Sequence, residues 1–203
     1  MNKDSIVLVG NFVEIQELVQ RLELTVDAVV DSNTSKLKGS GIINFASDQE
    51  FLNQDIVSTV FISPDSPKVR EKLFLEYESK GHSVTSLICP LATVSVSATI
   101  GVGSCIQSNA HISSKVKLGK GAKVNSCANI MHDSTIGDFT SIAPNAVILG
   151  GVQVGKKCYI GANSTILPNI KIGDESVVGA GSVVTKNVPP YSTVYGNPAR
   201  IKQ

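Results

Sequence analysis

One of the three histidines of the chain has neighbours suited to acid–base chemistry. His132 lies between Met131 and Asp133, and Gly150 follows it by eighteen residues. If residues eighteen apart lie side by side, the glycine leaves space beside the imidazole and exposes a backbone N–H. Acyl transfer needs such a pair, because the base removes a proton from the nucleophile and the N–H stabilises the oxyanion. An ordinary surface histidine is the alternative.

The other histidines and the cysteines give no second reactive cluster. His82 falls at an expected helix-to-strand turn and is predicted to be structural, and His111 is predicted to be structural or interfacial. The four cysteines lie far apart, without a C-x-x-C pair: Cys89, Cys105, Cys127 and Cys158. We therefore expect free, mostly packed thiols of a cytoplasmic protein, and no metal site.

The element that must position His132 is a hexapeptide repeat. The series of aliphatic residues ends on both sides, because the next positions at the same spacing are His82 and Pro190. Between them an aliphatic residue recurs at every sixth position: Ile88, Val94, Ile100, Ile106, Ile112, Leu118, Val124, Ile130, Ile136, Ile142, Ile148, Val154, Ile160, Ile166, Ile172, Val178 and Val184. A period of six fits neither a helix nor a half-buried strand, but it is typical of a parallel β-helix in which each repeat forms a short strand and a corner.

Two further regularities refine this prediction. A small residue usually precedes each aliphatic residue by two positions, with Val116, Val152 and Ile170 as exceptions. Glycines also recur every eighteen residues: Gly101, Gly119, Gly137, Gly155 and Gly173. Three repeats therefore make one coil of a triangular prism, with coils stacked about 4.8 Å apart. Each glycine marks a corner where a Cβ would clash or where φ must be positive.

The composition bears on several classes of function. The formal net charge is +1 and the basic residues form no run, so nothing indicates binding to nucleic acid or anionic membranes. No apolar segment is long enough to span a bilayer, and the first residues do not resemble a signal peptide. A length of 203 residues allows one domain of ordinary size and a smaller one.

Residues 1–84 are predicted to form a small α/β domain. Strands at 5–10, 26–30 and 57–62 alternate with helices at 14–21 and 68–80, and residues 51–52 are assigned to a short helix. The helix at 68–80 is predicted to bury Val69, Leu73 and Tyr77 and to end at Gly81. Such alternation builds a parallel sheet. The β-helix is predicted over 85–188, followed by a tail at 189–203.

The carboxyl edge of this sheet is a candidate site for a nucleotide. A dinucleotide fold binds phosphate where the first strand meets the next helix, but only Gly10 remains of a G-x-G-x-x-G pattern. Asp31, after the second strand, could accept hydrogen bonds from a ribose or a base, or it could cap a turn or helix. Ser63 and Arg70 flank the end of the third strand, where a phosphate could bind; Arg70 is as consistent with an ordinary surface residue.

Several motifs resemble the hexapeptide-repeat sugar acyltransferases. They are H-D-S-T-I-G-D-F at 132–139, I-G-A at 160–162, V-G-A-G-S-V-V-T at 178–185 and V-Y-G-N-P-A-R at 194–200. The first resembles the NeuD/PglD group, which acetylates sialic acids or nucleotide-linked amino sugars. The resemblance implies a small Rossmann-like α/β domain followed by a left-handed parallel β-helix, assembled as a homotrimer.

The resemblance also implies roles for individual residues. His132 matches the general base, Asp133 the acidic residue that raises its basicity, and Gly150 the oxyanion amide. The positions matched to the acetyl-CoA groove are Ser141, Ala162 and Ala180. Those assigned to the nucleotide-linked sugar are Gly10, Asp31, Ser32, Ser63 and Asn125. Four basic residues are candidates for the CoA phosphates: Lys156, Lys186, Arg200 and Lys202. The chain departs from the family after the first strand, where residues 11–14 replace a glycine-rich loop that carries a histidine.

We therefore predict a metal-free, acetyl-CoA-dependent N-acetyltransferase of polysaccharide biosynthesis, with His132 acting on the amine of a nucleotide-linked amino sugar. An O-acetyltransferase acting on a sialic acid or a cell-surface polysaccharide sugar is the alternative, and the altered first loop slightly favours it. Zinc hydration chemistry of the γ-carbonic-anhydrase type needs three converging histidines, and the repeat contains two. A scaffold that only trimerises a binding domain is the last alternative.

Overall fold

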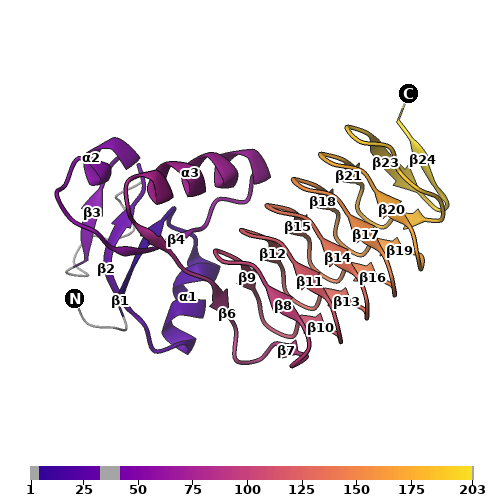
Figure 1. Ribbon diagram of the computed structural model, residues 1–203, viewed down its shortest axis with the longest axis horizontal. Helices are drawn as coiled ribbons and strands as arrows, with labels where there is room; N and C mark the ends of the chain where they lie inside the picture. The colour runs from indigo at the N-terminus through magenta and orange to yellow at the C-terminus, as the bar shows by residue number, and fades with distance from the viewer. Residues whose placement is uncertain (1–4, 33–41, 203) are drawn as a thin grey trace. The chain divides into compact units, whose positions relative to one another are not determined.

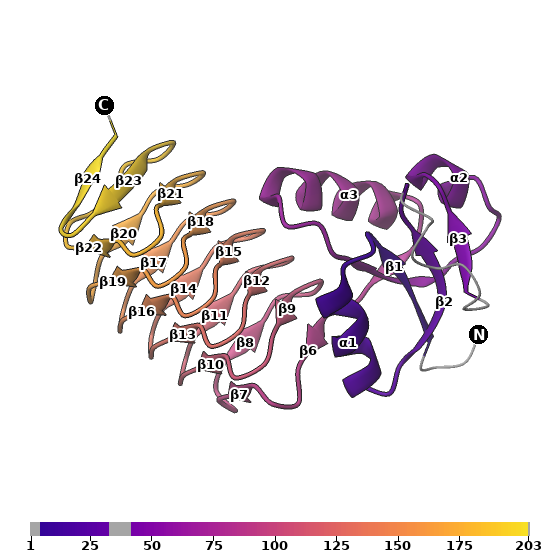
Figure 2. The same ribbon diagram turned by 180° about the vertical axis from the view of Figure 1, so that it is seen from behind.

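A computed structural model of the protein describes residues 5–32 and 42–202. The chain divides into two compact units, Met1–Leu87 and Ile88–Gln203, which we describe separately (Figures 1 and 2). Within these described ranges, no helix has the length and apolar character needed to cross a membrane.

The first unit is a five-stranded parallel sheet with the order β3-β2-β1-β4-β5. Its strands are β1 (Ser5–Val9), β2 (Thr25–Val30), β3 (Ile43–Phe45), β4 (Thr59–Ile62) and β5 (Ser83–Val84). Its helices are α1 (Val13–Arg21), α2 (Asp48–Leu52) and α3 (Pro67–Ser79). The three strands and three helices predicted from sequence are confirmed. The two edge strands β3 and β5 were not predicted, because three and two residues are too few to show a periodicity.

The buried face of α3 differs from the prediction in one position. Leu73 and Tyr77 are buried as expected, but Val69 is 45% exposed and the neighbouring Arg70 is buried instead. The Arg70 guanidinium donates hydrogen bonds to the backbone carbonyls of Pro64 (2.8 Å) and Asp65 (3.0 Å). The interpretation of Arg70 as a surface residue is therefore wrong. Its side chain stabilises the loop between β4 and α3. The two hydrogen bonds offset the cost of removing the guanidinium charge from water.

His82 belongs to a buried aromatic cluster, which confirms its structural role. Its ring lies against Phe51 and Tyr77, with ring centroids 5.2 and 5.5 Å away. The backbone N–H of Ser58 donates to His82 Nδ1 at 3.3 Å. Tyr77 donates its hydroxyl proton to Asp48 Oδ1 at 2.8 Å, and burial raises the pKa of Tyr77. Burial also lowers the pKa of His82 below its ordinary value of 6.5.

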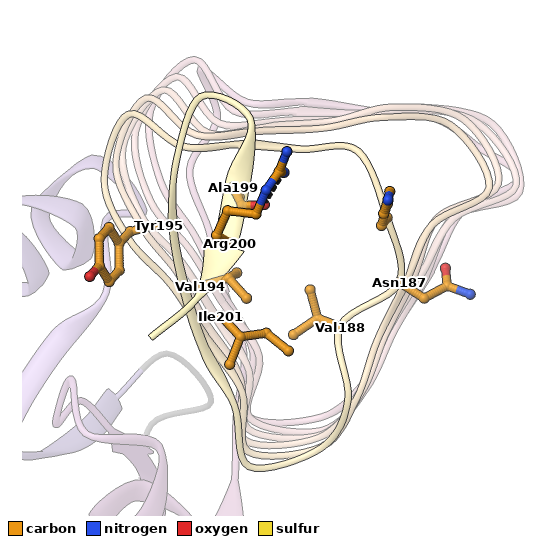
Figure 3. A pocket seen from close by; sticks show the side chains of 8 residues that line it. Asn187, Val188, Val194, Tyr195, Ala199, Arg200 and Ile201 are labelled. Carbon is orange, nitrogen blue, oxygen red and sulfur yellow. Dashed lines mark hydrogen bonds between the residues drawn. The ribbon is translucent and has the colours of Figure 1, made fainter. Parts of the chain in front are cut away.

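The second unit is a parallel β-helix with three sheets, and Figure 3 shows its stacked coils end-on as a rounded triangle. The six-stranded sheet contains β7 (Thr93–Val94), β10 (His111–Ile112), β13 (Asn129–Ile130), β16 (Val147–Ile148), β19 (Thr165–Ile166) and β22 (Val183–Val184). The five-stranded sheet contains β8 (Thr99–Ile100), β11 (Lys117–Leu118), β14 (Thr135–Ile136), β17 (Gln153–Val154) and β20 (Lys171–Ile172). The eight-stranded sheet contains β6 (Leu87–Ile88), β9 (Cys105–Ile106), β12 (Lys123–Val124), β15 (Ser141–Ile142), β18 (Tyr159–Ile160), β21 (Val177–Val178), β23 (Thr193–Gly196) and β24 (Ala199–Ile201).

The register between coils is eighteen residues. Ile130 pairs with Ile112 on one side and with Ile148 on the other, and the same offset holds in the other two sheets. From Ile106 to Val184 the predicted aliphatic residues are all buried in one core. The first three members of the series are less buried: Ile88 is 36% exposed, and Val94 and Ile100 are partly buried against the core. At the other end β23 pairs in parallel with β21, and β24 returns antiparallel to β23.

Two kinds of corner residue turn the coil. The glycines eighteen apart from Gly101 are required for close approach of neighbouring backbones: a Cβ on Gly101 would lie 2.4 Å from the carbonyl carbon of Gly119. Positive φ occurs at a different position, three residues after each aliphatic residue from Ile100 to Val178, and therefore at all three corners of the prism. Glycine and asparagine fill eight of these fourteen positions, as the left-handed region favours. Asp133 (φ 60°) and Lys115 (φ 58°) occupy adjacent positions of this kind at the corner that follows the six-stranded sheet.

We expect the stability of the first unit to decrease as the pH falls through about 6.5. The unfolded chain binds a proton at His82 near its ordinary pKa of about 6.5, whereas the folded chain, with the lower pKa, resists that proton. Since the unfolded state then binds more protons, the free energy of unfolding falls with pH until the folded-state pKa is also passed. Thermal unfolding between pH 7.5 and 5 measures this slope.

The matched variants are His82→Asn and His111→Asn. The first keeps an acceptor for the Ser58 N–H but does not titrate, so it should be less stable at pH 7.5 and show a flatter slope. The second removes a half-buried histidine of the β-helix and should leave the slope unchanged. An unchanged slope in His82→Asn would contradict the assignment.

Candidate active site

His132 lies at the corner that follows β13, between the six-stranded and the five-stranded sheets. The backbone fixes this corner on both sides, since Met131 N–H donates to Ile148 O (2.8 Å) and Asp133 N–H donates to Ser114 O (3.0 Å). The side chain of His132 is 60% exposed. The sequence period therefore places the imidazole on the outer surface, where a substrate can reach it.

Asp133 orients the imidazole. His132 Nδ1 and Asp133 Oδ2 are 2.8 Å apart. The hydrogen bond to His132 is the largest cause that holds the pKa of the Asp133 carboxyl below its usual value, and the positive charge of Lys115 adds to it. An ionised carboxylate accepts only, so Nδ1 carries the proton and Nε2 is left as the basic nitrogen. This tautomer is the one that a general base requires.

Gly150 lies directly beside the imidazole, one coil further along. A Cβ built on Gly150 would lie 2.7 Å from His132 Cε1 and 2.9 Å from Nε2, so any larger residue would displace the ring. Backbone hydrogen bonds join this coil to the coils on either side. Gly151 N–H donates to His132 O at 2.9 Å, and Asn169 N–H donates to Gly150 O at 3.0 Å. Within the described residues, the coil provides no hydrogen-bond acceptor for the Gly150 N–H. A base and an amide donor thus lie side by side.

The residues matched to the acetyl-CoA groove do not lie at this corner. Ala162 and Ala180 are one coil apart at the corner that follows the eight-stranded sheet, which we call the Ala162 corner. Asn125 lies at the same corner of an earlier coil, and its side-chain amide donates to Ile142 O at 2.8 Å. Ser141 is on β15 of the eight-stranded sheet and is buried. The six-stranded sheet separates the Ala162 corner from His132.

In the first unit all four predicted residues follow the carboxyl ends of strands of the sheet. Gly10 has φ of +91°, and a Cβ there would lie 2.6 Å from Ser63 Oγ. The Ser63 hydroxyl donates to Val9 O (2.7 Å) or Gly10 O (2.9 Å). Asp31 Oδ2 accepts a hydrogen bond from Asn11 N–H at 2.7 Å. Ser32 is exposed next to it.

Three of the four cysteines are packed inside the molecule. Cys158 is fully buried, its Sγ donates to Gly173 O at 3.1 Å, and burial raises the pKa of its thiol. The cysteines are free, and only Cys127 is exposed. Residues 5–32 and 42–202 contain no group of three or more His, Cys, Asp or Glu side chains that could hold a metal ion.

A pocket of about 650 Å³ covers the C-terminal end of the coil (Figure 3). Val188, Val194 and Ile201 form its apolar floor, and Lys186 and Arg200 contribute positive charge. Two of the four basic residues selected from the sequence therefore meet in one pocket. A third, Lys156, lies 4.0 Å from Asp174 in an exposed ion pair.

Comparison with known proteins identifies the family to which the chain belongs. The family model of the bacterial transferase hexapeptide (six repeats) matches residues 133–167 and 151–186. The structure of WeeI from Acinetobacter baumannii AYE is 30% identical, with a TM-score of 0.87 over 97% of this chain and 99% of that chain. The chain belongs to the hexapeptide-repeat sugar acyltransferases. It is therefore an acyltransferase, and its repeats fit the left-handed β-helix of that family.

Two further structures of hexapeptide-repeat enzymes resemble the whole chain. PerB from Caulobacter crescentus, solved in complex with CoA and GDP-perosamine, is 27% identical, with a TM-score of 0.90 over 98% of this chain and 97% of that chain. The acetyltransferase domain of PglB from Neisseria gonorrhoeae FA1090 is 25% identical, with a TM-score of 0.91 over 98% of this chain and 100% of that chain. No curated protein matches the sequence.

We expect Gly150→Ala to lower kcat by roughly 100-fold with little change in stability. The added methyl group would meet the imidazole at 2.7 Å, so the ring must rotate, and a displacement of about 1 Å at a catalytic group costs on the order of 100-fold in rate. Steady-state kinetics together with thermal unfolding measures both effects. Ser114→Ala, at the same corner one coil earlier, is the matched control and should remain active. An active Gly150→Ala enzyme would show that this corner is not the site.

Proposed function

We propose that this acyltransferase moves the acetyl group of acetyl-CoA to the amine of a nucleotide-linked amino sugar, with His132 as general base. The observation that carries the proposal is the geometry at one corner: His132 Nδ1 is bonded to Asp133 at 2.8 Å, and its opposite edge lies against Gly150. The CoA and GDP-perosamine complex of PerB supports the choice of both substrates.

The proposed reaction is a direct transfer between two bound substrates. His132 Nε2 accepts a proton from the amine as the amine nitrogen forms a bond to the thioester carbon. The Gly150 N–H donates to the oxyanion that develops, which is worth about 3 kcal/mol when the donor is well placed. As the carbon–sulfur bond breaks, the imidazolium returns the proton to the CoA sulfur. Because Cys158 is buried and the pKa of its thiol is raised, it is not a suitable nucleophile for an acyl-enzyme.

We assign the nucleotide to the α/β domain at residues 1–84. The strand order β3-β2-β1-β4-β5 is that of a Rossmann-like sheet, in which ligands bind at the carboxyl ends of the strands. Gly10, Asp31, Ser32 and Ser63 are the residues proposed to contact the nucleotide. Asn11, whose N–H donates to Asp31, replaces the family's glycine-rich loop and fixes the acceptor geometry of that carboxylate.

We assign acetyl-CoA to a groove shared by two chains of a trimer. Ala162 and Ala180, with Asn125, are proposed to line the groove beside the acetyl group, and Lys186 and Arg200 to bind phosphates. Ser141, which the sequence also assigned to the groove, is buried and does not line it. In one chain the Ala162 corner and His132 are a full face of the prism apart, about 15–20 Å for six extended residues. A site that uses both corners therefore takes them from adjacent chains. The free cysteines are consistent with a cytoplasmic enzyme.

The test of this function is product formation from acetyl-CoA and a panel of GDP-, UDP- and dTDP-linked amino sugars. We expect acetyl transfer to nitrogen, identified by mass spectrometry and NMR of the product. His132→Ala should lower kcat by about 10²–10⁴, the usual contribution of a general base, while CoA binding measured by calorimetry is retained.

The comparison substrates are the corresponding hydroxy sugars. An acetyl ester on a sialic acid or polysaccharide sugar, with no amide product, would favour the O-acetyltransferase. Wild-type activity in His132→Ala would exclude His132 as the base, and failure to bind millimolar CoA would argue against acetyl transfer from CoA altogether.

Subunit mixing tests the shared groove. His132→Ala and Ala162→Trp trimers should each be inactive, but an equal mixture unfolded and refolded together should regain about a quarter of the wild-type activity, since about one site in four over all the trimers formed receives both intact corners. Refolding each variant alone is the control. No recovery in verified mixed trimers would place both corners of a site on one chain.

A further inference from the structure

Lys115 lies directly beneath the acid of the active site. It is eighteen residues before Asp133, and the two residues occupy the same left-handed corner position on adjacent coils, with φ of 58° and 60°. Asp133 N–H donates to Ser114 O at 3.0 Å, which fixes the acid above the corner that carries Lys115. The two Cα atoms are therefore about 4.8 Å apart, the spacing of neighbouring strands.

A second pair, at the equivalent left-handed position of another corner of the prism, shows what this geometry allows. Lys157 and Glu175 are also eighteen residues apart and also have positive φ, 54° and 55°. Lys157 Nζ lies 3.3 Å from Glu175 Oε1, so a lysine at such a position reaches an acid on the next coil. At the active-site corner the acid is the shorter aspartate, and its Oδ2 is already bonded to His132.

Lysine is not favoured at this corner by its backbone. An L-residue with a Cβ pays roughly 1–2 kcal/mol in the left-handed region, a cost that glycine does not pay and asparagine pays less. Asparagine occurs at Asn169 in this same column, and at Asn109, Asn145 and Asn163 in the equivalent left-handed position of another corner. The side chain of Lys115, rather than its backbone, must therefore provide any benefit of having lysine here.

We propose that Lys115 is a positioning residue of the acyl-transfer site: its ammonium charge keeps Asp133 ionised and opposes protonation of His132, so that the imidazole stays a neutral base. The proposal rests on the role proposed for His132. The charged groups that act on Asp133 are His132 on its own coil and Lys115 on the coil before. The coil after it presents Gly150 and Gly151, which carry no charge.

The sign of the effect follows from charge alone. Removing the cation leaves the Asp133 anion to act on His132 without opposition, so His132 binds a proton more readily. The acid limb of the kcat/KM profile then moves to higher pH, and activity below neutral pH falls. In water, a unit charge at about 8 Å changes a titration midpoint by about 0.3–0.5 pH unit, and added salt screens the effect.

The experiment compares three variants of the full chain. Lys115→Asn removes the charge but suits the left-handed corner, and Lys115→Arg keeps the charge. Lys157→Asn makes the same exchange at the equivalent left-handed position of another corner, away from Asp133. We measure the pH profile of kcat/KM and, by NMR, the titration midpoint of the His132 ring, assigned with His132→Gln.

We expect Lys115→Asn to raise both midpoints by about 0.3–0.5 pH unit at low ionic strength and by less in 0.5 M salt. Lys115→Arg and Lys157→Asn should leave both midpoints unchanged. An unchanged ring midpoint in Lys115→Asn, or an equal shift in Lys157→Asn, overturns the proposal. Because the ring titration needs no substrate, it remains decisive even if the proposed acetyl transfer is not found.

Discussion

The hydrogen bonds between neighbouring coils, which pair residues eighteen apart, are the constraint on which the rest of the structure depends. They measure 2.8–3.1 Å around the active site, and they repeat at every strand. Because they fix the register, every corner position forms a column, and a residue's neighbours are set by adding or subtracting eighteen. The pairs His132 with Gly150 and Asp133 with Lys115 are both products of this one rule.

The rigidity of that register also explains why two adjacent side chains can support acyl transfer without a deep cavity. The imidazole is held by Asp133 on one side and by the bare backbone of Gly150 on the other. Both partners lie on coils that backbone hydrogen bonds hold in place. Little reorganisation of the site is therefore needed when negative charge develops on the oxyanion. The site is open in one chain, and a groove shared between chains is the means we propose for excluding water from it.

The sequence was most informative where the period was regular. The aliphatic series and the eighteen-residue offset predicted the β-helix, its core and the contact between His132 and Gly150. They did not predict the positions of positive φ, because Cys127, Phe139 and four charged residues interrupt what would otherwise read as a series of glycines and asparagines. Lys115 could have been found with the same offset, applied backwards from Asp133. In the first unit, Val69 was misassigned because a periodicity argument cannot foresee that a buried arginine will satisfy two loop carbonyls.

The end of the coil has a consequence for how the molecule behaves at high concentration. A stack of parallel strands presents, at its last rung, unpaired groups that another stack could extend, which is the route to fibres. Here β24 turns back against β23, so the eight-stranded sheet ends on a short antiparallel strand that carries Arg200 and is followed by Lys202. Charge and reversed polarity make this rim a poor template for end-to-end growth, and an otherwise open-ended solenoid is limited to a finite length.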